Sequence, residues 1–161
     1  MNENWIPKHK ILTVAQAEAK AKELKEDGKI VGFTNGCFDC LHLGHVYSLM
    51  EAKKECDVLF VGLNSDASIK KLKGEDRPLQ NELTRAVLLA SMEFIDYVII
   101  FGDDTALPLV EAIQPDVIAK EGYTIDRWPE GQYVASYGGK VVTLPRLEGY
   151  STTCMVEKIK K

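Results

Sequence analysis

The chain has 161 residues, of which 45% are hydrophobic and 27% charged, and its formal net charge is −4 at pH 7. These values are typical of one folded domain, and the acidic balance argues against a general nucleic-acid binder. No apolar run approaches the ~20 residues that cross a bilayer, and residues 1–10 lack the core of an export signal. We therefore expect a single cytoplasmic domain over residues 1–161, with no membrane or nucleic-acid partner.

Residues 1–28 are expected to form an N-terminal arm and a helix packed on the domain. Residues 1–12 show no periodicity, which predicts an irregular arm. Thr13 and Gln16 fit a capping box with Thr13 as the N-cap, and Gly28 marks the end of the helix.

The segment 30–50 predicts a strand, a tight loop and a helix. Residues 30–34 are a short apolar run, as in a buried strand of a parallel sheet, and apolar residues recur at helical spacing after the loop. The first turn of such a helix has unpaired N–H groups and the positive end of the dipole. His42 and His45 lie on one face of that turn, and Gly44 would let a phosphate approach the backbone closely. The pattern predicts a cradle for a polyphosphate.

The rest of the chain alternates strands and helices. Strands are predicted at residues 57–63, 96–101, 116–119 and 140–144, and helices at 81–94, 104–113, 129–137 and from Ser151 onward. Asp104 or Thr105 is the expected cap of the third-last helix. The alternation predicts an α/β fold, a Rossmann-like three-layer sandwich with a five-stranded parallel sheet. Dinucleotide and P-loop fingerprints are absent, which disfavours dehydrogenases and P-loop kinases.

A basic cluster follows the strand predicted at residues 57–63. Asp66 ends that strand where α/β folds place ligand-binding loops. Residues 68–78 are expected to be a loop, with Lys71 and Lys73 among its cations. Such a cluster is either a solvated surface or a set of phosphate ligands.

Two cysteines lie beside the histidine pair. Cys37 and Cys40 with His42 and His45 invite a zinc or redox interpretation, but all four side chains come from nine consecutive residues. Structural zinc sites separate their ligand pairs by a dozen or more residues. We therefore predict no metal ligand and interpret both thiols as bystanders, with a zinc-binding module as an alternative.

Two motifs resemble those of the cytidylyltransferase-like nucleotidyltransferases. Residues 36–45 resemble the G-x-F-D-x-x-H-x-G-H signature, and residues 146–153 resemble the R-x-E-G-x-S-T-T motif. The resemblance extends from Lys29 onward and implies a homodimeric H-x-G-H nucleotidyltransferase. It implies catalytic roles for His42, His45 and Lys73, nucleotide binding by Gly36, Phe38, Asp39, Gly44, Lys120, Gly122, Arg146, Ser151, Thr152 and Thr153, and binding of the substrate phosphate by Lys71, Arg85 and Asp66.

The sequence most resembles the branch of this family that makes ADP-heptose from ATP and heptose 1-phosphate, with Mg²⁺ and release of pyrophosphate. That branch usually has Lys-Gly-Gly-Asp-Tyr where this chain has Glu121 and Tyr123 around Gly122. A cytidylyltransferase acting on glycerol 3-phosphate or a similar alcohol phosphate, and a nucleotide-binding sensor without turnover, are the alternatives. An attacking phosphate is already ionised, so we assign no general base.

Overall fold

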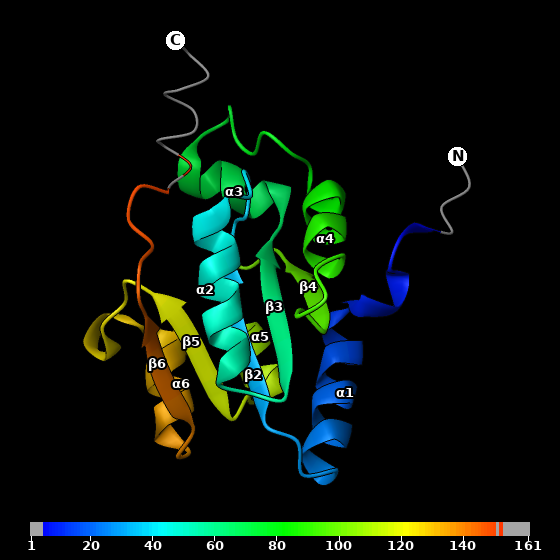
Figure 1. The fold of residues 1–161 in the computed structure, drawn as a ribbon, viewed down its shortest axis with the longest axis vertical. Helices are drawn as coiled ribbons and strands as arrows, with labels where there is room; N and C mark the ends of the chain where they lie inside the picture. Colours follow the sequence, from blue (N-terminus) through cyan, green and yellow to red (C-terminus); the bar gives the residue numbers. More distant parts are fainter. Residues whose placement is uncertain (1–4, 151, 153–161) are drawn as a thin grey trace.

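The structure is a computed structural model that describes residues 5–150 and residue 152. In this part of the chain a six-stranded parallel sheet, ordered β1-β4-β3-β2-β5-β6, lies between two layers of helices (Figure 1). The strands are β1 (Ile11–Leu12), β2 (Val31–Gly36), β3 (Val58–Asn64), β4 (Tyr97–Phe101), β5 (Val117–Glu121) and β6 (Lys140–Leu144). The helices are α1 (Val14–Glu26), α2 (Leu43–Lys54), α3 (Asp66–Lys73), α4 (Glu82–Ala90), α5 (Leu107–Ile113) and α6 (Pro129–Ser136), with 3-10 turns η2 (Lys8–Lys10) and η3 (Ile125–Arg127).

The predicted three-layer α/β sandwich is confirmed, but the sheet has a sixth strand. β1 lies within the segment expected to be irregular, where Ile11 and Leu12 pair with Val98 and Ile99 of β4. Lys10 anchors the arm, because its Nζ donates to the carbonyls at 92 (3.2 Å) and 95 (2.8 Å). Two residues are too few to show a period of two, so this edge strand leaves no pattern in the sequence.

The helix α1 begins with the predicted capping box. Thr13 Oγ1 accepts a hydrogen bond from the Gln16 N–H (3.3 Å), and Gln16 Oε1 accepts one from the Thr13 N–H (2.9 Å). Gly28 follows the helix with φ +74°, a left-handed conformation that glycine adopts without steric cost.

Two hydrophobic cores lie on the two faces of the sheet. α1, α5 and α6 pack on one face around Phe33 and Phe60, and α2 and α4 pack on the other around Leu59 and Val61. The central strands β2 and β3 are buried on both faces, which explains their nearly continuous apolar runs.

Three local predictions are wrong. The first half of the segment expected to be a loop is the helix α3, capped by Ser65, whose hydroxyl accepts from the N–H of Ser68. The helix expected over residues 81–94 ends at residue 90. The N-cap of α5 is Ala106, and not Asp104 or Thr105, although Thr105 Oγ1 accepts a hydrogen bond from the N–H of Leu107 (3.4 Å); the N–H of Ala106 donates to the Glu130 carboxylate of α6. Each difference depends on a contact or cap that the charge pattern alone does not show.

None of the helices among the described residues is long and apolar enough to span a bilayer.

Candidate active site

The predicted phosphate cradle lies at the first turn of α2, beside the carboxyl end of β2. His42 is the N-cap, and its Nδ1 accepts a hydrogen bond from the N–H of His45 (3.3 Å). The two imidazole rings are stacked, with centroids 3.8 Å apart and planes at 22°. Phe38 packs edge-on against His45 at 5.3 Å. The H-x-G-H segment is therefore a preorganised pair of imidazoles on a helix N-terminus.

Glycines allow this pair and the preceding turn to pack closely. A Cβ on Gly44 would lie 3.0 Å from two atoms of the His42 ring and 3.1 Å from the carbonyl oxygen of Tyr150. A Cβ on Gly36 would lie 3.0 Å from the ring of Phe38, which itself has a left-handed φ of +46°. The protein's own side chains thus leave little room for a Cβ at either glycine, so a larger residue would displace the His42 or Phe38 ring.

Both histidines are neutral at pH 7. Burial, followed by the electrostatic coupling to His42 and the positive charge of Lys73, lowers the pKa of His45 to about 4, because a second charge on His45 would meet like charge. Burial also lowers the pKa of His42, where the Glu121 carboxylate acts in the opposite direction and Arg146 in the same one. The Nδ1 atom of His45 is buried without a hydrogen-bond partner among the described residues. Neutral imidazoles can still donate N–H groups to phosphate oxygens, and an arriving polyphosphate would raise both pKa values.

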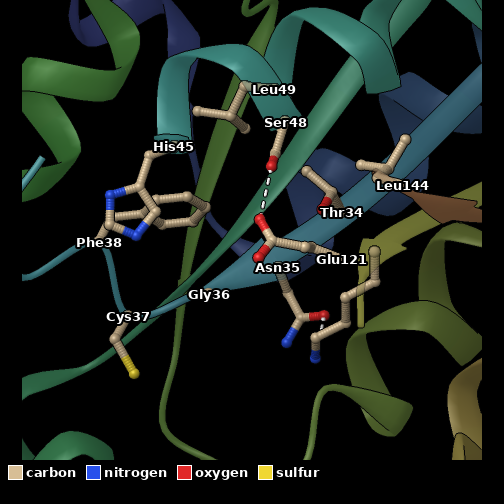
Figure 2. A pocket seen from close by; sticks show the side chains of 11 residues that line it. Thr34, Asn35, Gly36, Cys37, Phe38, His45, Ser48, Leu49, Glu121 and Leu144 are labelled. Atoms are coloured by element: carbon tan, nitrogen blue, oxygen red, sulfur yellow. Dashed lines mark hydrogen bonds between the residues drawn. The ribbon is translucent and has the colours of Figure 1, made fainter. Parts of the chain in front are cut away.

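A pocket of about 170 Å³ lies beside His45, one member of the histidine pair (Figure 2). Ser48 donates its hydroxyl to Glu121 Oε2 (2.9 Å), and Arg146 Nε lies 3.4 Å from Glu121 Oε1. Lys120 Nζ donates to Asn35 Oδ1 (3.1 Å). The pocket, which we call the histidine pocket, is lined by Thr34, Asn35, Gly36, Cys37, Phe38, His45, Ser48, Leu49, Lys120, Glu121 and Leu144.

Asp39, which is predicted to bind nucleotide, is buried and hydrogen-bonded within the protein. Its carboxylate accepts hydrogen bonds from Arg77 Nη1 (2.8 Å) and from the N–H groups of Leu79 (2.6 Å) and Gln80 (3.1 Å). Burial acts to raise the pKa of Asp39, but these hydrogen bonds together hold it below its usual value. The helix cap is the side chain of His42, so Asp39 contributes to the site by fixing the loop beside it.

Arg85, predicted to reach the substrate phosphate, is fully buried. Its guanidinium donates to the carbonyls of Gln80 (2.9 Å), Cys37 (2.6 Å) and Asn64 (2.8 Å), and to Asp66 Oδ1 (2.7 Å). Four of its five N–H groups are therefore used inside the protein. This geometry contradicts direct contact with a phosphate: Arg85 and Asp66 tie the carboxyl ends of β2 and β3 to α3 and α4.

The two lysines assigned to phosphates lie at the exposed end of α3. Lys71 pairs with Asp104 at 3.2 Å, and both side chains are largely exposed. Lys73 is also exposed, and its charge helps to lower the pKa of His45, which places it in electrostatic reach of the cradle. Exposed lysines near an anion site can move to meet a phosphate.

The end of β5 contributes the next predicted residues. Lys120 is half-buried; its Nζ lies 4.4 Å from the centroid of the Tyr123 ring, and burial lowers its pKa. Gly122 adopts a left-handed φ of +74° that turns the chain away after the strand. The structure thus brings Lys120 into the site and gives Gly122 a conformational role.

The second motif is described in part. Arg146 follows β6 and pairs with Glu121, a lining residue of the histidine pocket, and its binding of nucleotide stays a prediction. Thr152 is helical, whereas Ser151 and Thr153 lie outside the described residues.

Among the pocket residues that were missing from the sequence-based set, Asn35, Ser48 and Glu121 are the ones whose side chains form hydrogen bonds at the pocket. Asn35 stands at a strand end, a position that could have indicated it. Ser48 lies one turn beyond His45 on α2, and Glu121 was noted only as a departure from the family pattern. Their convergence depends on the register of β2 with β5, which the sequence does not show.

Metal binding can be judged from the side chains present. Residues 5–150 and 152 contain no group of three or more His, Cys, Asp or Glu side chains that could hold an ion, and Cys37 and Cys40 are free thiols. Mg²⁺ bound to a triphosphate keeps several waters and takes one or two protein carboxylates. Glu121 lines the histidine pocket and could share such an ion, so the residues present fit a metal that arrives with the nucleotide.

Comparison with known proteins places this site in a family. The cytidylyltransferase-like family model matches residues 33–158, most of the chain. The chain is 49% identical over 148 residues to the bifunctional protein HldE of Rhodopseudomonas palustris strain BisB5, covering 91% of this chain and 30% of that protein. It is 47% identical over 157 residues to the HldE protein of Geobacter sulfurreducens, covering 91% of this chain and 32% of the relative. The chain therefore spans about a third of the length of these relatives.

Solved structures agree with this assignment. The lipopolysaccharide core biosynthesis protein of Thermoplasma volcanium superposes with a TM-score of 0.64 at 27% identity, covering 75% of this chain and all of that one. The pantoate-beta-alanine ligase of Francisella tularensis shares the fold, with a TM-score of 0.63 at 14% identity over 93% of this chain and 76% of that one. With its stacked histidines at the N-terminus of α2 and the family match over residues 33–158, the chain belongs to the cytidylyltransferase-like family of nucleotidyltransferases.

Proposed function

We propose that this chain transfers AMP from ATP to a sugar 1-phosphate, and that heptose 1-phosphate is the acceptor, giving ADP-heptose and pyrophosphate. The observation that carries the proposal is the stacked, neutral histidine pair on the N-terminus of α2, facing a pocket at the carboxyl edge of the sheet. The HldE relatives and the lipopolysaccharide core biosynthesis protein support the sugar acceptor.

The geometry suits an in-line displacement at the α-phosphorus. An oxygen of the sugar phosphate attacks, the bond from the α-phosphorus to the bridging oxygen breaks, and pyrophosphate leaves with that electron pair. Negative charge grows on the bridging and equatorial oxygens, so fixed positive dipoles and N–H donors stabilise the transition state. His42, His45 and the first N–H groups of α2 supply them, and the ionised acceptor needs no general base.

The remaining predicted groups have supporting roles in this scheme. The exposed side chain of Lys73 moves to contact the acceptor phosphate. Arg146 leaves its ion pair with Glu121 and binds the β- and γ-phosphates. Ser151, Thr152 and Thr153 bind the same two phosphates from the second motif. Mg²⁺ carried by the triphosphate would neutralise part of its charge. We further propose a homodimer that works in the cytoplasm.

A grid of pyrophosphate-release assays tests this function. ATP, CTP, GTP and UTP are each combined with heptose 1-phosphate, glycerol 3-phosphate and hexose 1-phosphates in the presence of Mg²⁺. We expect turnover with ATP and heptose 1-phosphate only. Turnover with CTP and glycerol 3-phosphate would keep the mechanism and overturn the substrates, whereas nucleotide binding without any turnover would indicate a sensor.

A further inference from the structure

A second pocket opens on the other side of Lys120. It has a volume of about 360 Å³ and shares Asn35, Gly36, Cys37 and Lys120 with the histidine pocket. Its own polar lining comes from the ends of β3, β4 and β5 and from the start of α6. We call it the Glu130 pocket, and its distinctive residues are Asn64, Asp104, Thr105, Tyr123 and Glu130.

The defining side chain is a carboxylate that is only 6% exposed. Glu130 Oε1 accepts a hydrogen bond from the N–H of Ala106 (3.0 Å), the N-cap residue of α5. This bond fixes the carboxylate at the pocket wall. A buried carboxylate with spare acceptor capacity is costly unless further donors meet it, which a ligand can supply.

The two pockets share a wall, which indicates that each of them binds one of the two substrates. Nucleotidyl transfer needs two ligands that meet at one phosphorus atom. Lys120 lines both pockets, and within the described part of the chain its Nζ has one hydrogen bond, to Asn35 Oδ1. An ammonium group has three donors, so two more can bind phosphate oxygens at the junction. With the nucleotide beside His45, the acceptor enters from the Glu130 pocket.

The lining chemistry indicates what part of the acceptor lies there. Glu130 and Asp104 can only accept hydrogen bonds when ionised, and the buried amide of Asn64 both donates and accepts. Hydroxyl groups complement such a set, and the partly exposed Tyr123 ring offers an apolar face. A carboxylate on the acceptor would instead meet like charge.

We propose that the Glu130 pocket binds the sugar part of the acceptor and that Glu130 selects neutral, hydroxyl-rich sugars over sugar acids. The inference rests on the proposed function, because it assumes a sugar phosphate as the second substrate. Glu130 contacts substrate directly in this proposal and determines specificity.

The variant Glu130→Gln tests this, because its amide oxygen can still accept from the Ala106 N–H while the charge and one acceptor are lost. We expect the acceptor KM to rise about tenfold or more, the effect of losing a hydrogen bond to a charged group, with the KM for ATP unchanged. A hexuronic acid 1-phosphate should inhibit the variant more tightly than wild type, while the matching hexose 1-phosphate inhibits it less tightly. This reversal reports charge at the ligand, which a loss of packing would not produce.

Glu111→Gln on the exposed face of α5 is the matched control and should leave all these constants unchanged. A changed KM for ATP with an unchanged acceptor KM would overturn the pocket assignment and leave the proposed function standing. If no combination of nucleotide and sugar phosphate is turned over, calorimetry with the sugar 1-phosphate alone tests the pocket assignment separately from the proposed function. Weaker binding to Glu130→Gln than to wild type would then support the pocket although the proposed reaction fails, and equal or absent binding would overturn it.

Discussion

The histidine pair and the buried arginine of α4 show two ways in which a site residue can act. His42 and His45 belong to one local segment, His45 lines a pocket, and burial lowers the pKa of both imidazoles. Arg85 is a permanent charge, fully buried, and bonded to four groups from three separate parts of the chain. The first region meets the ligand, and the second holds the strand ends that position the first. Removing a group from each should therefore affect different quantities.

The largest effect is expected from Arg85→Met, which leaves the Asp66 carboxylate and buried carbonyls without their donor. Asp66 is partly exposed, so the cost comes mainly from the three carbonyls that lose their donor, at about 1–3 kcal/mol for each buried group left unsatisfied, and it is measured as the free energy of unfolding by urea denaturation. Lys71→Met is the matched control, because it removes an exposed pair with Asp104 and should cost less than about 1 kcal/mol. Equal costs for the two variants would contradict the framework role of Arg85.

His45→Ala should lower activity and leave stability nearly unchanged, the reverse of Arg85→Met. We expect kcat to fall about 10²–10³-fold, the usual cost of one group that stabilises transition-state charge, with little change in the unfolding midpoint. His9→Ala, at an exposed histidine of η2, controls for loss of an imidazole elsewhere. His42→Ala should in addition lower the free energy of unfolding by about 1 kcal/mol, because His42 caps α2. Near-normal turnover in His45→Ala would refute its catalytic assignment.

The same contrast explains how much the sequence could predict. The cap at Thr13, the glycine at 28 and the H-x-G-H cradle involve residues a few positions apart, so local patterns showed them. The burial of Arg85 depends on carbonyls up to 48 residues away, and the N–H of Ala106 is held by Glu130, 24 residues away. Helical and strand periods indicate which face is apolar, but they do not show which polar groups meet across the sheet. Ligand-facing residues and framework residues therefore look alike in a motif.

As the pH falls, the free energy of unfolding should decrease first through protonation of the histidine pair and only at lower pH through protonation of Asp39. The folded pKa of His45 is about 4, below the value of 6.5 for an unperturbed histidine, so the unfolded chain binds protons more strongly. This contribution to stability is complete above pH 6.5 and is lost as the pH falls toward 4. Asp39, with a lowered pKa, loses its contribution only below about pH 4, the range of an unperturbed aspartate.

Urea denaturation at pH 7, 6 and 5 measures this slope. Wild type should lose stability over that range, and His45→Gln should lose less, because the glutamine does not titrate. Identical slopes in the two proteins would show that the protonation of His45 is not linked to unfolding. Arg85→Met should keep the wild-type slope, since it leaves both imidazoles in place.

The smallest chemical change is Gly44→Ala, which adds one methyl group between the two histidines of the H-x-G-H segment. Alanine is the better helix former by up to about 1 kcal/mol, so propensity alone predicts a stabilised α2. The added Cβ would lie 3.0 Å from the His42 ring and 3.1 Å from the Tyr150 carbonyl, so the imidazole must shift. We expect kcat to fall about tenfold while the unfolding midpoint changes little, because displacing a positioned group by a fraction of an ångström already slows the reaction. Full activity in this variant would mean that the exact stacking of His42 on His45 is not needed for catalysis, and the cradle would then act through its charge and backbone N–H groups alone.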